Sequence, residues 1–138
     1  MIAWLLDTNI CIYVIKRRPP QVLERFRRAD VSSIGISSIT FSELMFGAAK
    51  SSRPEQNRFA LTQFVAPLEI IPYDDVAAQW YGDLRACLER RGTPIGSLDM
   101  LIAAHALALD CILVTNNGKE FGRVPQLRME NWAMERGG

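Results

Sequence analysis

The hydrophobic positions of the chain fall into two kinds of segment that alternate along the sequence. Short, continuous apolar runs are typical of strands buried on both faces of a parallel sheet. Segments with apolar residues three and four positions apart are typical of amphipathic helices. The predicted strands are 2–6, 34–37, 68–71, 111–115 and a last one near 127–131. The predicted helices are 8–16, 21–29, 39–50, 53–65, 75–91 and 98–109.

This alternation has a direct consequence for the fold class. Strands that are joined by helices pair in parallel, and the connecting helices cover both faces of the sheet. The chain has 138 residues, a length that suits one compact domain with its own core. We therefore expect an α/β fold in a single domain over 1–138.

Three residues mark expected helix boundaries. Ser38 and Ser97 each precede a helical segment and are expected as its N-cap, because a serine hydroxyl accepts hydrogen bonds from free backbone N–H groups. Gly92 follows helix 75–91 and suits a C-cap, where a left-handed backbone is common.

Composition and charge narrow the class of protein only slightly. The net charge is +1, so no strong overall field indicates a nucleic-acid partner. No apolar run approaches the ~20 residues that span a membrane, and Asp7 ends the apolar N-terminus too early for a signal peptide. Cys11, Cys87 and Cys111 lack the spacing of a disulfide framework or a zinc site. We expect a soluble, cytoplasmic protein with reduced thiols.

Basic residues are concentrated in one early segment. This segment contains six basic residues and a single acid, Glu24; the basic residues are Lys16, Arg17, Arg18, Arg25, Arg27 and Arg28. A second group follows at Arg85, Arg90 and Arg91. Two interpretations stay open: a solvated helix face, or a rim that contacts the phosphates of a nucleic acid.

Three acidic residues are candidates for chemistry, and each also has a purely structural explanation. Asp7 ends the first strand, where binding sites of parallel sheets form, but it could simply cap the next helix. Glu43 has no basic partner at helical spacing, although a half-exposed position would also tolerate it. Asp99 lies in the first turn of its helix, where the helix dipole favours an acid.

Together these acids point to a metal site. Clustered carboxylates repel one another and usually persist around a cation. A set of oxygen ligands selects hard ions such as Mg²⁺, with Mn²⁺ as a substitute, rather than zinc. We therefore predict that Asp7, Glu43 and Asp99 form one acidic pocket that binds Mg²⁺ and hydrolyses phosphodiester bonds.

Three further polar residues have weaker claims to a role. Asn117 follows the fourth strand and could orient water or reach the ion, but Asn116-Asn117-Gly118 also reads as a plain turn. Glu120 comes shortly afterwards and is a weaker candidate. His105, the only histidine, is expected to be structural, so a Ser/His/Asp mechanism is not supported. The glycines form neither a dinucleotide-binding nor a P-loop pattern.

Four blocks of the sequence resemble the PIN-domain toxins of the VapC type. They are the Leu-Leu-Asp-Thr-Asn opening at 5–9, the stretch around Glu43 at 36–48, the stretch around Asp99 at 94–106, and Leu-Val-Thr-Asn-Asn-Gly-Lys-Glu-Phe at 113–121. The blocks occur in order over nearly the whole chain, which makes the resemblance more specific than any single motif.

The resemblance implies a fold, an activity and a set of site residues. The fold is a PIN-like three-layer α/β/α domain with a central parallel sheet of four to five strands. The activity is that of an Mg²⁺-dependent endoribonuclease, with metal-binding and catalytic roles for Asp7, Glu43 and Asp99. The fourth catalytic position is often an acid in PIN domains, whereas this chain has Asn117, which weakens the case for a second tightly held ion.

The resemblance also implies partners. Such proteins are the toxin half of a type II toxin–antitoxin pair, form homodimers and larger complexes, and are inhibited by a VapB-type antitoxin, which brings the complex to operator DNA. Their substrates are structured RNAs, notably tRNA, and the most similar-looking members suggest initiator tRNA.

Two other classes of function compete with this interpretation. A phosphoaspartate protein also places an aspartate at a strand end, but Asn9 stands where such phosphatases carry a second acid. A degenerate domain that only binds RNA or protein is the other alternative, and the intact set of three acids argues against it.

Overall fold

A computed structural model describes residues 1–134 of the chain; the expected domain, 1–138, extends beyond this range. These residues form five strands and seven α-helices, with one or two helices between successive strands, and a short 3₁₀ turn at Val31–Ser33 precedes the second strand. The strands are β1 Trp4–Leu6, β2 Ile34–Ser37, β3 Glu69–Ile71, β4 Ile112–Val114 and β5 Met129–Glu130. The helices are α1 Thr8–Lys16, α2 Pro20–Arg28, α3 Ser38–Lys50, α4 Pro54–Val65, α5 Asp75–Arg91, α6 Ser97–Leu109 and α7 Gly118–Phe121.

The five strands form one sheet in the order β3-β2-β1-β4-β5, and every neighbouring pair is parallel. The chain builds outward from β1 to β3 on one side and then crosses over to β4 and β5 on the other. The reversal of strand order falls between β1 and β4, and in open parallel sheets the carboxyl ends at such a point form the binding crevice. The predicted α/β class with a parallel sheet is confirmed.

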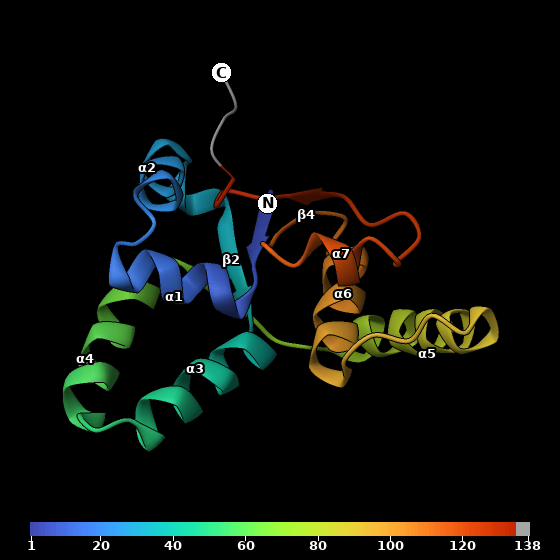
Figure 1. Ribbon diagram of the computed structural model, residues 1–138, viewed down its shortest axis with the longest axis horizontal. Helices are drawn as coiled ribbons and strands as arrows, with labels where there is room; N and C mark the ends of the chain where they lie inside the picture. Colours follow the sequence, from blue (N-terminus) through green and yellow to red (C-terminus); the bar gives the residue numbers. More distant parts are fainter. Residues whose placement is uncertain (135–138) are drawn as a thin grey trace.

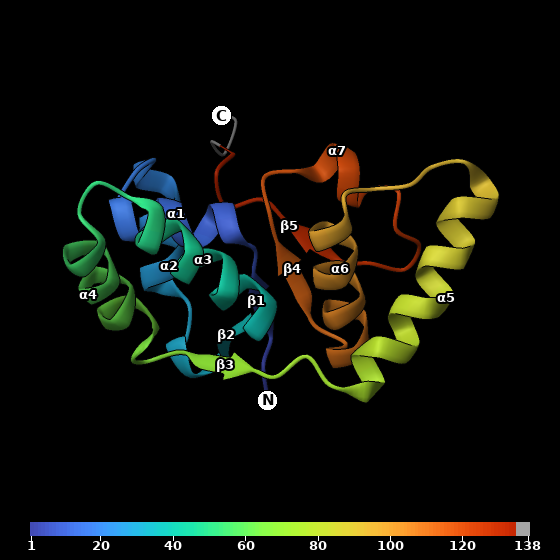
Figure 2. The same ribbon diagram turned by 90° about the horizontal axis from the view of Figure 1, so that it is seen from below.

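Helices cover both faces of the sheet, so the fold has three layers (Figures 1 and 2). Figure 2 shows α5 and α6 on one side of the sheet and α1, α2 and α4 on the other. Successive residues of β1 point to opposite faces: Leu5 packs in the core under α5 and α6, whereas Leu6 packs in the core under α1 and α2. The two cores fix the register of the central strand, and with it the position of the residue that follows.

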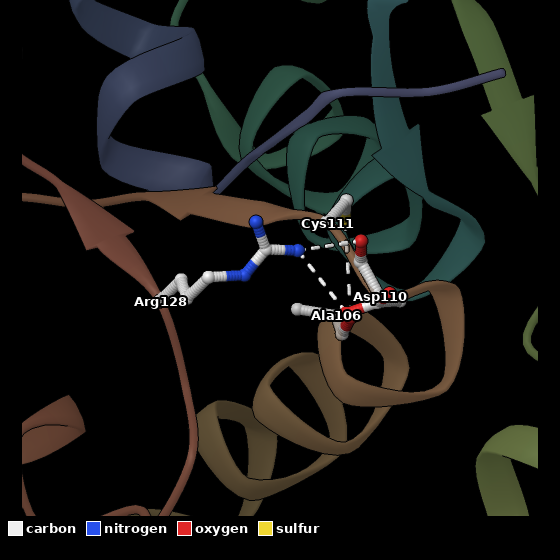
Figure 3. A network of polar contacts seen from close by, with 4 residues as sticks. All are labelled: Ala106, Asp110, Cys111 and Arg128. Atoms are coloured by element: carbon white, nitrogen blue, oxygen red, sulfur yellow. Dashed lines mark hydrogen bonds and ion pairs between the residues drawn. The ribbon is translucent and has the colours of Figure 1, made fainter.

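The C-terminal end of α6 is tied to the segment before β5 (Figure 3). Asp110 ends the helix in a left-handed backbone conformation, with φ 52°. The Arg128 guanidinium donates to the Asp110 backbone oxygen at 2.7 Å and to its carboxylate at 3.1 Å. Next to them, the Cys111 thiol donates to the Ala106 carbonyl. These contacts anchor the chain where it turns from α6 into β4.

Both predicted serine caps are wrong by one position. Ser37, not Ser38, caps α3, because its hydroxyl accepts from the Ile39 N–H at 3.1 Å. Ser38 is the first residue of the helix, and its hydroxyl accepts from the Tyr73 N–H instead. Gly96 occupies the N-cap position of α6, and Ser97 is already helical.

Other boundaries agree with the pattern or differ from it in small ways. Helices α1 and α5 have the predicted bounds, and Gly92 ends α5 with φ 69°. The expected turn after β4 continues into the short helix α7, which the sequence pattern did not predict. All three cysteines are free thiols. Within residues 1–134, no helix is long and apolar enough to cross a membrane.

The buried face of α5 provides a test of the packing. Leu88 is fully buried in the core that α5 shares with α6, whereas Val76 on the same helix is 46% exposed. We expect Leu88→Ala to lower the free energy of unfolding by about 2–5 kcal/mol through lost burial and a residual cavity. Val76→Ala should change it by less than about 0.5 kcal/mol. Urea unfolding of both variants measures the difference, and equal losses would contradict this packing.

Candidate active site

A cavity of about 510 Å³ opens at the carboxyl ends of the central strands. It is bounded by the first turn of α1, by α3, and by the loop and first turn that begin α6. The lining residues are Asp7, Thr8, Asn9, Glu43, Gly96, Ser97, Leu98, Asp99, Ile102 and Asn117. All four residues predicted to be catalytic therefore face one cavity.

Asp7 is held by the backbone that follows it. The residue comes directly after β1, and its carboxylate accepts from the Ile10 N–H at 2.9 Å, so it does cap α1. The Thr115 hydroxyl, at the end of the neighbouring β4, also donates to it. Asp7 is only 7% exposed, and burial raises its pKa in spite of these hydrogen bonds. The capping role and a role in the cavity thus coexist in one side chain.

Glu43 reaches the cavity from the second turn of α3. Its carboxylate accepts from the Thr8 hydroxyl at 3.1 Å, and the residue is half-buried. This contact joins α3 to the start of α1 beside Asp7. The negative charge of Glu43 contributes to the raised pKa values of both Asp7 and Asp99.

Asp99 lies in the first turn of α6 and has the most strongly perturbed carboxyl group of the cavity. Its pKa is raised from 3.8 to about 6, first by burial and then by the neighbouring Glu120 carboxylate, with smaller contributions from Asp7 and Glu43. Burial is the largest cause of this rise, and the Glu120 carboxylate adds to it because two neighbouring carboxyl groups disfavour each other's charge.

Glu120 is the residue whose importance the sequence pattern understated. It lies on α7, where its carboxylate accepts from the Gly96 N–H and, at 3.0 Å, from the Asn117 side-chain amide. These bonds, with the Gly96 N–H first, lower the pKa of Glu120. Asn117 therefore positions a fourth acid beside Asp99 in addition to lining the cavity. Predicting a helix at Gly118–Phe121 would have revealed this role of Glu120, since the helix places Asn117 and Glu120 on one turn.

Among the described residues, no basic side chain compensates the charge of the cavity. Within residues 1–134, no Lys or Arg lines it, and Asp7, Glu43 and Asp99 make no ion pair. The same part of the chain holds no group of three His, Cys, Asp or Glu side chains already gathered closely enough to bind a metal ion. Asp7, Glu43 and Asp99 thus line one cavity without forming a preformed metal-binding cluster among the described residues.

The donor set of the cavity fits a hard divalent cation. Its charged groups are carboxylates and its neutral ligand atoms are amide and hydroxyl oxygens, and none of the described residues brings a thiol or imidazole to it. Such a set suits Mg²⁺ or Mn²⁺ and not zinc. Burial and mutual repulsion already raise the pKa values of Asp7 and Asp99, so a cation there would relieve an existing electrostatic cost.

His105 lies outside the cavity, as expected for a structural residue. It is 1% exposed, and its Nδ1 lies 2.8 Å from the Ser37 hydroxyl. Burial lowers its pKa, so the neutral ring is favoured.

The early basic residues divide into two groups. The Arg25 guanidinium stacks over the rings of Trp4 and Trp132, at 5.6 and 5.1 Å, and pairs with Glu130 at 3.4 Å. It lines a second hollow, of about 700 Å³, whose other arginine pairs with Glu24. The exposed members of the set are Lys16, Arg17, Arg18, Arg27 and Arg28. Arg25 thus has a structural role, and the exposed residues are the ones open to a partner.

Comparison with known proteins places this geometry in a family. A family model described as PIN domain matches residues 4–127. The tRNA(fMet)-specific endonuclease VapC of Salmonella typhimurium is 46% identical over 132 residues, which cover 96% of this chain and 99% of that protein. Ribonuclease VapC2 of Rickettsia felis is 45% identical, with 94% and 97% of the two chains covered.

A solved structure shows the same arrangement of the chain. The crystal structure of DNA-bound VapBC from Salmonella typhimurium contains a chain that matches this one with a TM-score of 0.91 and 45% identity, over 96% of this chain and 99% of the other. The chain therefore belongs to the PIN-domain family and, within it, to the VapC group of ribonucleases.

Proposed function

We propose that this chain is the toxin component of a type II toxin–antitoxin system and acts as an Mg²⁺-dependent endoribonuclease. The observation that supports this most strongly is the cavity itself, in which Asp7, Glu43 and Asp99 converge without a basic partner among the described residues. Membership of the VapC group supports hydrolysis of RNA as the reaction. The cation requirement follows from the charge, because the same cavity without a cation would repel a phosphodiester.

The side chains of the cavity divide the work. Asp7 and Asp99 would hold the ion, with Glu43 as a further ligand, directly or through water, and Asn117 completing the shell. A bound Mg²⁺ supplies a Lewis acid that lowers the pKa of water and offsets charge on the leaving oxygen. Glu43, oriented by the Thr8 hydroxyl, accepts the proton of the attacking water. Glu120 lies beside Asp99 and raises its pKa, and the Asn117 side-chain amide orients the Glu120 carboxylate.

The substrate and the partners follow from the relatives. Because the Salmonella relative is named for tRNA(fMet), we propose a structured RNA in the cytoplasm, with initiator tRNA as the first candidate. VapBC complexes, two of them bound to DNA, are among the similar structures. We accordingly propose inhibition by a VapB-type antitoxin, a homodimer within a larger complex, and operator DNA contacted through the antitoxin.

The exposed basic residues at the end of α1 and on α2 are proposed to guide the RNA backbone. Lys16, Arg17, Arg18 and Arg27 make no ion pair within residues 1–134. Phosphate contacts by such residues release counterions, so affinity for RNA should fall as salt rises. Arg25 is left out of this surface because two tryptophans and Glu130 already engage it.

The phosphoaspartate alternative has less support from the cavity. Enzymes of that kind pair the nucleophilic aspartate with a second acid two positions later, and Asn9 occupies that position here. Labelling of Asp7 by a phosphodonor would favour this alternative. RNA binding without cleavage in Mg²⁺ or Mn²⁺ would favour the degenerate, binding-only domain.

The first prediction concerns Asp7→Asn. An asparagine keeps the oxygen that caps α1 but removes the charge, so the fold should persist while RNA cleavage falls by roughly 100-fold or more. Asp83→Asn, at an exposed position of α5, is the matched control and should cleave like the wild type. Circular dichroism and a cleavage assay in Mg²⁺ measure both properties. A well-folded Asp7→Asn variant that still cleaves RNA would rule out this site.

The second prediction concerns the stability cost of Asp99. Folding raises its pKa from 3.8 to about 6, so the metal-free protein should lose stability as the pH rises through this interval. Asp99→Asn removes that cost. At neutral pH it should raise the free energy of unfolding by about 1 kcal/mol after allowance for solvent screening, and Tm by a few degrees. Below pH 3.8 the gain should vanish.

Added Mg²⁺ completes this test. It should raise Tm of the wild type and have little effect on Asp99→Asn, because ligand binding to the folded state stabilises it by mass action. Thermal melts with and without Mg²⁺ provide the measurement. Equal responses of the two proteins to Mg²⁺ would remove Asp99 from the proposed ligand set.

The third prediction concerns the substrate. Sequencing of RNA ends after induction of the chain in a bacterial host should show one dominant cleavage site in initiator tRNA, absent with Asp7→Asn. Co-expression of the cognate VapB-type antitoxin should suppress it. Dominant cleavage of another RNA would overturn the tRNA assignment and leave the proposed chemistry in place.

A further inference from the structure

A buried polar contact lies next to the acidic cavity but outside it. His105 Nδ1 and the Ser37 hydroxyl are 2.8 Å apart, and their residues are 1% and 0% exposed. The Ser37 hydroxyl also accepts from the Ile39 N–H, which starts α3. The Tyr73 ring packs edge-on against the imidazole, with centroids 5.5 Å apart and planes at 79°. Both polar groups are therefore held from several sides.

The contact joins the two segments that carry Glu43 and Asp99. Ser37 is the last residue of β2 and the N-cap of α3, the helix on which Glu43 lies. His105 lies on α6, the helix that carries Asp99 in its first turn. Within residues 1–134, this is the one side-chain hydrogen bond between α6 and the β2–α3 segment. It therefore connects the two elements that carry Glu43 and Asp99.

The two segments have a reason to separate at this point. Glu43 and Asp99 are both acidic, and the charge of Glu43 is one of the causes of the raised pKa of Asp99. The hydrogen bond that Glu43 accepts comes from Thr8 on α1, so it does not hold α3 against α6. Repulsion between the acids would thus widen the cavity unless another contact opposed it.

A histidine is an unusual choice if only the volume of this buried position mattered. A buried polar ring costs free energy unless it is hydrogen-bonded, whereas an apolar side chain would fill the same space without that cost. What the polar pair adds is direction: a hydrogen bond restricts distance and angle, and apolar contacts do not. The contact therefore constrains where α6 lies relative to the start of α3.

We propose that His105, acting through Ser37, is a positioning residue that sets the separation of Asp99 from Glu43 and thereby the affinity of the cavity for a divalent cation. The proposal rests on the metal-dependent function proposed above. His105 touches neither the substrate nor the ion; its effect passes through the placement of α6 and α3.

Four variants test the proposal. His105→Leu removes the polar atom, and Ser37→Ala removes the hydroxyl that it contacts. His105→Asn keeps an amide atom near the position of Nδ1 and serves as the conservative rescue. Leu88→Ala, in the core that α5 shares with α6, is the control for loss of stability alone. Each variant is compared with the wild type by the Mg²⁺ concentration that gives half of the Mg²⁺-induced rise in Tm, and by kcat for RNA cleavage at saturating Mg²⁺.

The expected result separates positioning from stability. His105→Leu and Ser37→Ala should need roughly tenfold more Mg²⁺ for the half-maximal effect, in line with other residues that orient metal ligands. His105→Asn should return this concentration to within about twofold of the wild type. Leu88→Ala should lower Tm but leave the half-maximal Mg²⁺ concentration unchanged. If His105→Leu does not fold, Ser37→Ala and His105→Asn still give the comparison.

Other outcomes would overturn the proposal in distinguishable ways. An unchanged Mg²⁺ requirement in folded His105→Leu or Ser37→Ala shows that the contact is only structural. A shift in Leu88→Ala of the same size shows that general loosening of the core is the cause. A wild type that neither responds to Mg²⁺ nor cleaves RNA would instead overturn the proposed function on which the inference rests.

Discussion

Carboxylates are crowded at the carboxyl ends of β1, β2 and β4, and the surrounding structure must hold these mutually repelling groups together. Asp7 is almost fully buried, and the pKa of Asp99 reaches about 6 because burial and neighbouring acids disfavour its charge. Within residues 1–134, no Lys or Arg lines the cavity to offset this charge. A fold that brings acids together in this way loses stability, and such losses are common at functional sites.

The scaffold opposes that repulsion with short, directional contacts. The Ile10 N–H and the Thr115 hydroxyl hold Asp7, and the Thr8 hydroxyl holds Glu43. On the other side of the cavity, the Asn117 amide and the Gly96 N–H hold Glu120 beside Asp99. The strand order places all of these groups at the reversal between β1 and β4, where a parallel sheet opens its binding crevice.

Much of this arrangement could be predicted from the sequence. The alternation of apolar runs and helical segments was enough to predict the parallel sheet, because each run had to be covered on both faces. The lack of basic partners near Asp7, Glu43 and Asp99 in the sequence led to the prediction that they share one pocket. The structure places all three in one cavity. Binding of Mg²⁺ there stays a prediction.

What the sequence could not resolve has identifiable physical causes. Ser37 and Ser38 are equally good caps, and only the contacts with His105 and Tyr73 decide which hydroxyl does which task. Asn116-Asn117-Gly118 has the composition of a turn, so the short helix that brings Glu120 to Asp99 was not predicted. The basic segment gave no sign that Arg25 stacks on aromatic rings, because Trp132 is far away in the sequence.

The most direct test of the central claim is the location of a divalent cation by anomalous scattering from crystals grown with Mn²⁺. The account predicts one strong peak in the cavity bounded by Asp7, Glu43 and Asp99, and its loss in crystals of Asp7→Asn. If crystals of protein that cleaves RNA show no peak in this cavity, or show the ion at a different site, the account is contradicted.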